Sequence, residues 1–293
     1  MKILVLGSQG QVGWELARSL LPLGEVVALS RAEADLANPD QLRTVVRALQ
    51  PTLIVNAAAY TAVDKAESEE ALAFAINATG PGVLAEEAKR CGALLIHYST
   101  DYVFDGTLDR PYVETDTPNP QSVYGKSKLA GEQAIAASGC DYLVLRTSWV
   151  YGARGHNFMR TILRLAKERE QLRIVADQFG APTWSRWIAD ATAHVALAAV
   201  QRRRQDQFDA AVLHLAGAGS TTWHGFATAI VEKYRITHPE SPLNVREIVA
   251  IATADYPLPA PRPSNSRLNC TALINRYGIA IPQWNAMLQL ALQ

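Results

Sequence analysis

A tyrosine and a lysine four residues apart, Tyr124 and Lys128, are the pair in this sequence best suited to acid–base chemistry. On a helix, this spacing places both side chains on one face, one turn apart. A phenol has a pKa of about 10 and exchanges protons poorly at neutral pH. A neighbouring ammonium group stabilises the phenolate and lowers that pKa. Such a pair also arises by chance, but here we interpret Tyr124 as a proton donor tuned by Lys128, which can also hold a cofactor ribose.

A threonine hydroxyl is predicted to assist this tyrosine. The apolar run at residues 94–97 is followed by Ser99, Thr100 and Asp101. Ligands bind at the edge of a parallel sheet where the strands have their carboxyl ends. We therefore expect Thr100 to hydrogen-bond a substrate carbonyl whose proton comes from Tyr124. Ser99 is an alternative for this role, and a structural ST-turn is an alternative for both hydroxyls.

A glycine-rich turn lies near the start of the chain. Gly7, Gly10 and Gly13 form a G-x-x-G-x-x-G pattern between an apolar run and a helical pattern. Gly7 permits the tight turn, Gly10 lets backbone amides approach a pyrophosphate, and Gly13 lets helix and strand pack closely. Free N–H groups at the start of the helix then face the anion. Glycines also mark ordinary turns, but this position predicts dinucleotide binding by the whole turn, which includes Gln9, Gln11 and Val12.

The end of the second apolar run bears on the choice between NAD and NADP. An acidic residue at this point accepts a hydrogen bond from the ribose 2′-hydroxyl and favours NAD. Here the run ends in Ser30 and Arg31, a donor and a cation that suit a 2′-phosphate. The sequence therefore predicts NADPH as the cofactor. Glu33 and Asp35 lie close by, so use of NADH as well stays open.

The elements that must position these residues alternate along the first two thirds of the chain. Apolar runs predict strands at residues 3–6, 26–29, 53–55, 94–97 and 143–145. Helical patterns lie between them at residues 12–21, 39–49, 68–90 and 123–137. Apolar strands separated by helices indicate a parallel sheet that is covered on both faces. Right-handed crossovers make this an α/β fold with a doubly wound, Rossmann-type sheet.

The pattern changes after Trp149. Helices are predicted at residues 158–168, 188–200 and 223–234, strands at 172–175 and 213–216, and loops at 177–183 and 256–263. The second loop contains four prolines, which remove donors and fix φ. We therefore predict an NADP-binding domain at residues 1–150, with residues 171–205 packing back on it. Residues 151–170 and 206–293 are predicted to form a smaller C-terminal α/β lobe that binds the substrate.

Composition limits the remaining choices. The 28 Lys and Arg residues equal the 28 Asp and Glu residues, so no net charge attracts nucleic acid or a membrane surface. Three widely spaced cysteines, Cys91, Cys140 and Cys270, fit reduced thiols in an intracellular protein. The first apolar run is too short for a signal peptide or a membrane span. We expect a cytoplasmic enzyme with no nucleic-acid or membrane partner, and no metal site among its scattered histidines.

The order of these motifs resembles that of the extended short-chain dehydrogenases/reductases. It runs from the glycine turn through NAAAYT at 56–61 and YSTDYVFDG at 98–106 to Tyr124 and Lys128. Within that group the chain is most similar to the dTDP-4-dehydrorhamnose reductase family. This similarity extends to AYTAVD at 59–64, SWVYG at 148–152, DQFGAPT at 177–183 and RPSNS at 262–266. The blocks cover most of the chain and are together more specific than any single motif.

The resemblance implies that NADPH reduces the C4 keto group of dTDP-4-dehydro-β-L-rhamnose to give dTDP-β-L-rhamnose. This sugar nucleotide serves cell-surface polysaccharides such as the O-antigen of lipopolysaccharide. Beyond Tyr124, Lys128 and the glycine turn, the implied cofactor contacts are Ser30, Arg31, Asp35, Leu36, Ala57, Ala58, Ala59 and Tyr60. The implied substrate contacts are Thr61, Val63, Thr100, Asp101, Tyr102, Trp149, Tyr151 and Arg262, the last of them pairing with the pyrophosphate.

Differences from related enzymes narrow the predicted function. Relatives that dehydrate nucleotide sugars carry Asp-Glu after the threonine, whereas Tyr102 stands in the second place here, which argues against dehydration. Some family members form dimers bridged by magnesium through glutamates. Glu15 matches one such position but Arg186 occupies the other, so we expect no metal, and a monomer and a homodimer both stay open. Two other functions also stay open: an epimerase or reductase of another nucleotide sugar, with Cys140 and His156 as candidates by type, and a non-catalytic NADP-binding regulatory subunit.

Overall fold

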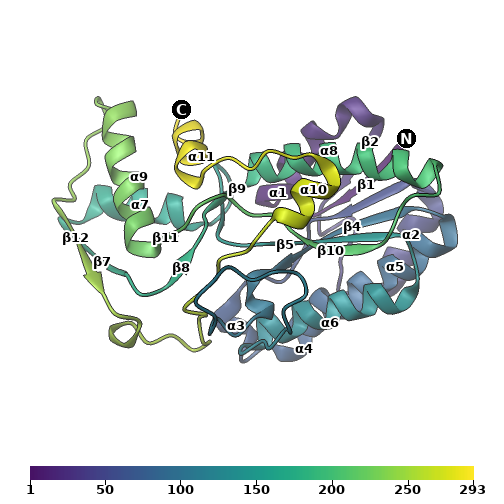
Figure 1. The fold of residues 1–293 in the computed structure, drawn as a ribbon, viewed down its shortest axis with the longest axis horizontal. Coiled ribbons are helices and arrows are strands. Elements are labelled where there is room, and N and C mark those ends of the chain that lie inside the picture. Colours follow the sequence, from purple (N-terminus) through teal and green to yellow (C-terminus); the bar gives the residue numbers. More distant parts are fainter.

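A central sheet of six parallel strands forms the middle of the molecule, in a computed structural model that describes all of residues 1–293. The strands lie in the order β10-β5-β4-β3-β1-β2 (Figure 1). They are β1 (Lys2–Leu6), β2 (Glu25–Leu29), β3 (Leu53–Asn56), β4 (Leu94–Thr100), β5 (Tyr142–Thr147) and β10 (Ala211–His214). The first five confirm the strands predicted from the apolar runs. Their parallel pairing, with helices on both faces, confirms the doubly wound α/β fold class.

Two apolar cores cover the two faces of this sheet. Ile3 and Val5 point to one face and Leu4 and Leu6 to the other, because successive side chains of a strand alternate. The first core is closed by α1 (Gln11–Ser19), α8 (Ser185–Arg204) and α10 (Thr271–Tyr277). The second is closed by α2 (Pro39–Leu49), α5 (Gly80–Cys91) and α6 (Val123–Ser138). Burial on both faces explains why these strands consist of apolar runs rather than alternating patterns.

The single helix predicted at residues 68–90 is divided in the structure. It consists of α4 (Glu70–Phe74), a π-helical turn at Ala75–Thr79, and α5. Pro81 follows this turn and has no N–H to donate, so the regular helical bond to the carbonyl four residues earlier is missing. Wide turns of this kind often occur at functional sites. Here the turn places Asn77 and Ile76 toward the cofactor side of the fold.

A smaller C-terminal lobe lies beside the sheet (Figure 1). In it, β7 (Gln171–Val175) pairs with β12 (Glu247–Ile251), and a separate apolar core forms around Phe226 and Ile230. The helices of this lobe are α7 (Phe158–Glu168), α9 (Trp223–Thr237) and α11 (Trp284–Ala291). Short strand pairs link it to the rest of the chain: β6 (Val150–Tyr151) with β9 (Thr183–Trp184), and β8 (Phe179–Gly180) with β11 (Thr221–Thr222). No helix in the fold is long and apolar enough to cross a membrane.

Several segments lie elsewhere than the predicted organisation places them. Strand β10 comes from the region assigned to the substrate lobe, yet it pairs with β5 at the edge of the main sheet. Strand β7 comes from the region expected to pack on the first domain, yet it pairs with β12. The predicted loop at 177–183 contains β8 and the start of β9. These differences arise from long-range backbone pairing, which local patterns do not encode. The bounds given to the two lobes, and the roles of NADP binding and substrate binding assigned to them, stay predictions.

Candidate active site

The glycine turn forms a cradle at the N-terminus of α1. Gly7 has φ of +79°, in the left-handed region that favours glycine. A Cβ atom on Gly13 would lie 2.0 Å from the carbonyl oxygen of Gly7, so only glycine allows this approach of helix and turn. No side chain caps the start of α1. Its first N–H groups are therefore free to bind an anion, which suits the pyrophosphate of a dinucleotide.

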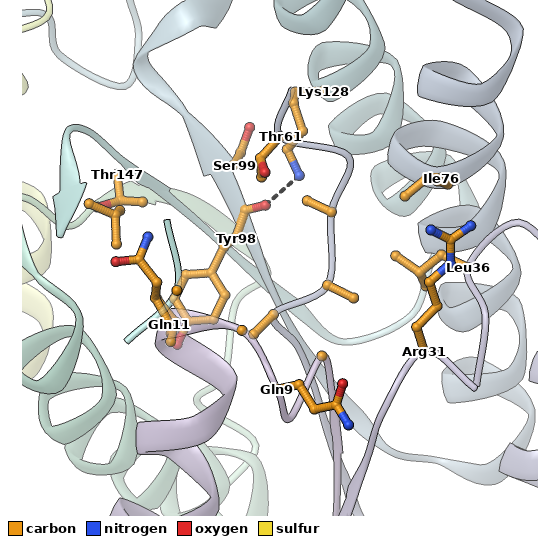
Figure 2. A pocket seen from close by; sticks show the side chains of 18 of the residues that line it. Gln9, Gln11, Arg31, Leu36, Thr61, Ile76, Tyr98, Ser99, Lys128 and Thr147 are labelled. Carbon is orange, nitrogen blue, oxygen red and sulfur yellow. Dashed lines mark hydrogen bonds between the residues drawn. The ribbon is translucent and has the colours of Figure 1, made fainter. Parts of the chain in front are cut away.

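A cavity of about 490 Å³ begins at this cradle and reaches the carboxyl ends of β4 and β5. Figure 2 shows Arg31 and Leu36 toward one end, Gln9 and Gln11 beside the glycine turn, and Lys128 with Ser99 and Thr61 farther along. Fourteen predicted site residues line it: Gly7, Gln9, Gly10, Gln11, Val12, Arg31, Asp35, Leu36, Ala57, Ala58, Ala59, Thr61, Tyr124 and Lys128. The residues present therefore fit an extended dinucleotide with its pyrophosphate at the helix N-terminus.

Eight further residues line this cavity without having been predicted to do so: Ala34, Ile76, Tyr98, Ser99, Thr147, Val150, Gly155 and His156. Ser99 was considered only as an alternative to Thr100. Its position and that of Thr147 follow from strand register, because Thr100 lies opposite Thr147 in the pairing of β4 with β5. A sequence signal for Thr147 and Val150 existed, since both follow the predicted strand at 143–145 and so lie at the ligand-binding edge.

The rim near Arg31 carries one exposed ion pair and a serine that is hydrogen-bonded to a carboxylate. Arg31 Nε lies 3.3 Å from Asp35 Oδ2, and the Arg31 side chain is 72% exposed. The backbone N–H and the hydroxyl of Ser30 both donate to Glu33 Oε2 at 2.8 Å. Ser30 does not line the cavity in this structure. Both residues predicted to bind a 2′-phosphate are thus held by neighbouring carboxylates, which a phosphate would have to displace.

Tyr124 and Thr100 meet at the opposite end. Tyr124 is the second residue of α6. Ser122 caps this helix, because its hydroxyl accepts a hydrogen bond from the N–H of Gly125 at 3.1 Å. Burial raises the pKa of Tyr124 to about 12, and a hydrogen bond with Thr100 acts in the opposite direction. Tyr124 is therefore a protonated phenol at neutral pH, which is the state that a proton donor needs.

Asp101 orders the threonine. The Thr100 hydroxyl lies 3.1 Å from Asp101 Oδ1, and Thr100 Oγ1 accepts from the N–H of Tyr102 at 3.2 Å. Asp101 is only 3% exposed. Burial raises the pKa of its carboxyl to about 6, against the opposing effect of hydrogen bonds with Ser266 and Thr100. This arrangement brings together three of the predicted site residues: Thr100 at the end of β4, Asp101 in the turn that follows it, and Tyr124 in α6.

Lys128 points toward the strands rather than toward Tyr124. Its Nζ lies 2.7 Å from the carbonyl oxygen of Tyr98 and 3.1 Å from His97 Nε2 (Figure 2 shows the first contact). Burial lowers the pKa of Lys128 to about 8, with Glu132 acting in the opposite direction. The expectation that Lys128 lowers the pKa of Tyr124 is wrong for this state, because the dominant effect on the phenol is burial, which raises its pKa.

A second, smaller cavity of about 160 Å³ lies where the proline-rich loop meets the segment that follows β4. Tyr102 and Arg262 line it. Arg262 Nη2 lies 2.8 Å from Asp64 Oδ2, and Asp64 also accepts from the N–H of Ala260 at 3.2 Å. Asp64 lies in α3 (Val63–Ala66), which starts at Val63. Arg262 was predicted to pair with a pyrophosphate, whereas here it joins the loop to the first domain through a carboxylate.

Three predicted contacts have side chains engaged elsewhere. The hydroxyl of Tyr60 donates to Glu69 at 2.6 Å, away from the cavity. Tyr151 is fully buried in the core of the C-terminal lobe against Phe226, so the expectation that it flanks the sugar is not met. Its position in β6 turns the side chain inward. Trp149 has φ of +48° and stacks on Trp223, with ring centroids 3.5 Å apart.

Groups considered for metal binding or epimerisation are separated. No group of three or more His, Cys, Asp or Glu side chains gathers to hold a metal ion. Burial raises the pKa of Glu15, the charges of Arg186 and Arg18 act in the opposite direction, and the carboxylate of Asp190 adds to the rise. Cys140 is buried in the second core and does not line the cavity, whereas His156 does.

Two buried amides position the site, and the sequence reasoning missed both. Asn77, in the π-helical turn, accepts from the N–H of Tyr60 at 2.9 Å and donates to its carbonyl at 3.0 Å. Asn56, at the end of β3, accepts from the N–H of Ala58 at 3.1 Å. Together they fix the loop that carries Ala57 to Tyr60. The available signal was a polar residue at the end of an otherwise apolar strand.

Comparison with known proteins agrees with this geometry. The RmlD substrate binding domain family matches residues 1–293. A dTDP-4-dehydrorhamnose reductase of Burkholderia thailandensis is 57% identical, over 97% of this chain and 95% of its own. The crystal structure of a dTDP-4-dehydrorhamnose reductase from Clostridium acetobutylicum aligns with a TM-score of 0.89 and 35% identity, over 100% of this chain and 98% of its own. That of the Bacillus anthracis enzyme in complex with NADP has a TM-score of 0.85 and 32% identity, over 99% and 98%. The chain therefore belongs to the dTDP-4-dehydrorhamnose reductase family.

Proposed function

We propose that this protein catalyses the reduction of the C4 keto group of dTDP-4-dehydro-β-L-rhamnose by NADPH, giving dTDP-β-L-rhamnose. The observation that carries the proposal is that Tyr124 and Lys128 line a cavity that begins at the phosphate cradle, with the hydroxyl of Thr100 in hydrogen-bond contact with Tyr124 behind it. Its relatives at up to 57% identity bear the name of this enzyme.

The protein groups have separable tasks in this reaction. When bound, NADPH supplies a hydride. The N-terminus of α1 and the glycine turn hold a pyrophosphate, and Lys128 is the cation available for a ribose. Negative charge develops on the ketone oxygen in the transition state, and donors aimed at that oxygen stabilise it. Tyr124 is one such donor, and Thr100 becomes a second when its proton turns from Asp101 Oδ1, to which it is donated in this structure. Tyr124 then gives up the proton of its Oη, which its raised pKa keeps in place until the oxygen becomes basic.

Tyr102 favours reduction over dehydration. Removing water from a sugar requires a base next to the acid, and a carboxylate would serve. Tyr102 stands in that place, and burial raises the pKa of its phenol above its ordinary value. A buried phenol is a poor base at neutral pH. Its ring instead packs edge-on against Tyr124, with centroids 5.5 Å apart, and so helps to hold the proton donor.

Substrate contacts and cellular context form part of the same proposal. Thr61, Tyr102 and Arg262 line the two cavities and are the proposed sugar-nucleotide contacts. Val63, Asp101 and Trp149 are proposed as further contacts because they belong to the motifs shared with the family. We place the reaction in the cytoplasm, where NADPH is generated, and assign its product to cell-surface polysaccharide synthesis. Either a monomer or a homodimer is compatible with a site built from one chain.

A coupled assay tests the proposal. NADPH oxidation is followed by absorbance with dTDP-4-keto-6-deoxyglucose, with and without a 3,5-epimerase. Oxidation that requires the epimerase supports the rhamnose-forming reaction. Oxidation without the epimerase would indicate another 4-keto sugar as substrate. Binding of NADPH with no oxidation under either condition would contradict an enzymatic role and favour a regulatory NADP-binding protein.

A further inference from the structure

A buried histidine contacts the catalytic lysine. His97 lies in β4 and is 1% exposed. Its Nε2 is 3.1 Å from Lys128 Nζ, and its Nδ1 is 3.0 Å from Asn56 Nδ2 on the neighbouring strand. Asn56 and His97 are direct partners in the pairing of β3 with β4, so the backbone register fixes this contact. The result is a line of three side chains, Asn56–His97–Lys128, behind the cofactor cavity.

The orientation of the Asn56 amide follows from an unambiguous donor. The N–H of Ala58 can only donate, and it lies 3.1 Å from one end of the Asn56 side chain. That end is therefore the carbonyl oxygen Oδ1, and the other end is the NH₂ group. An NH₂ group can only donate, so Nδ1 of His97 must accept and carries no proton. A neutral imidazole then holds its single proton on Nε2, facing Lys128.

The histidine is neutral in this environment. Burial, with a smaller effect from the nearby Lys128, lowers the pKa of His97 well below its ordinary value. One proton is therefore shared between two ring nitrogens, and Asn56 decides which nitrogen has it. An Nε2–H group can only donate, and an ammonium group on Lys128 can also only donate, so these two groups cannot form a hydrogen bond with each other. The contact at 3.1 Å is favourable only when Lys128 presents the lone pair of a neutral amine.

We propose that His97 is a positioning residue, held by Asn56 in the Nε2–H tautomer, that binds the neutral amine of Lys128 and opposes its protonation until the lysine turns toward the cavity. The neutral amine has two N–H groups and one lone pair. It donates to the carbonyl of Tyr98 and accepts from His97. The charged form has no acceptor on His97 and must find its partners on the cavity side. This inference rests on the proposed role of Lys128 at the cofactor site.

The other titratable groups around Lys128 do not prevent His97 from affecting its protonation. Glu132, one turn later on α6, raises the pKa of Lys128, but its carboxylate is paired with Arg146 of β5 at 2.6 Å. Tyr124, one turn earlier, is a neutral phenol, and Asp101 at the end of β4 acts on Tyr124 and Tyr102. His97 is thus the uncharged group in direct contact with Nζ whose proton position can change the balance.

NMR of the free protein tests the inference without any assay of turnover. In ¹⁵N-labelled protein, the ring nitrogens of His97 should report a neutral Nε2–H tautomer from pH 6 to 9. An Nδ1–H tautomer or an imidazolium in that range overturns the inference. Because no substrate is present, this outcome is independent of which sugar nucleotide the enzyme reduces.

A variant pair tests the control of the lysine. In Asn56→Asp, the carboxylate keeps the bond from Ala58 and accepts from Nδ1–H, so Nε2 becomes an acceptor for the Lys128 ammonium. The midpoint of the Lys128 ¹⁵Nζ titration should rise by about one pH unit or more. In the His97→Leu background the same Asn56→Asp change should raise it much less. An equal rise in both backgrounds would mean that the new charge acts directly, and the role of His97 would be refuted.

Discussion

The two ends of the cofactor cavity are built in different ways. At the catalytic end, Thr100, Asp101 and Lys128 are each at most 5% exposed, and every one of them is held by a hydrogen bond to a neighbouring strand, turn or helix. At the other end, the Arg31 side chain is 72% exposed and its partner is a carboxylate four residues away. The same cavity therefore joins a buried site of low dielectric constant to an exposed, solvated one.

This difference in exposure determines how strongly a substitution at each end should change the rate or the affinity. Burial raises the pKa of Tyr124 to about 12 and lowers that of Lys128 to about 8, so the fold sets the pKa of the proton donor and that of its neighbour in opposite directions. Charges on the rim are screened by water and salt, and exposed ion pairs contribute at most about 1 kcal/mol. Substitutions at the buried end should thus affect rate strongly, whereas those at the rim should adjust affinity.

The largest effect is expected for Tyr124→Phe, which removes the proton donor and keeps the ring. Turnover should fall by about 10² or more, the usual size of acid–base catalysis, while the affinity for NADPH changes little. NADPH oxidation and cofactor titration by fluorescence measure the two quantities. Lys126→Met, on the same helix but exposed, is the control and should retain turnover. Normal turnover of Tyr124→Phe would refute the assignment of the donor.

The phosphate cradle should be nearly as sensitive. In Gly13→Ala the new methyl group would lie 2.0 Å from the Gly7 carbonyl, so the turn or α1 must shift. We expect NADPH to bind about tenfold or more weaker, which corresponds to roughly 1.4 kcal/mol. Gly82→Ala in α5 is the matched control, because its methyl group meets only the side chain of Ala134 at 3.3 Å. If the two variants bind NADPH equally well, the close approach at Gly13 has no role in binding.

The pair Arg262–Asp64 lies between these extremes, with side chains 16% and 37% exposed. Arg262→Ala should raise the KM for the sugar nucleotide about tenfold, because it removes a charge-assisted hydrogen bond and any contact with the diphosphate. Asp64→Asn separates the two causes, since it removes the charge and one acceptor oxygen from the link to the loop and leaves Arg262 in place. Equal effects of the two substitutions would mean that Arg262 acts only by joining the proline-rich loop to Asp64. A larger effect of Arg262→Ala would support direct binding of the substrate.

The sequence predicted those parts of the site that local chemistry determines. The glycine turn, the apolar strands and the Tyr124–Lys128 spacing each specify a short-range geometry, and the structure has five of the predicted strands and all of the glycine turn in place. Thr100 was predicted from its position at the end of β4. Each of these signals is contained within about ten residues of the chain.

Features that depend on distant segments could not be predicted in this way. The edge position of β10 next to β5 follows from pairing across more than sixty residues of sequence. The orientation of Lys128 depends on His97 and Tyr98 from another element, and the burial of Tyr151 depends on Phe226 in α9. The residues next to Lys128 and Tyr151 in the sequence do not indicate which distant side chains these two residues contact. Tertiary packing, rather than spacing, decides where such side chains point.

The smallest effect is expected at the solvated rim. Arg31→Ala removes a cation that suits the 2′-phosphate, so the KM for NADPH should rise about threefold to fivefold, the limit for an exposed ion pair. The KM for NADH, which lacks that phosphate, should not change. Asp35→Asn should act in the opposite direction for NADPH, because it frees Arg31 from the contact at 3.3 Å. Equal losses for both cofactors in Arg31→Ala would place the arginine away from the phosphate. High salt should also reduce the difference between the two cofactors in the unaltered enzyme, whereas the effect of Tyr124→Phe at the buried end should persist.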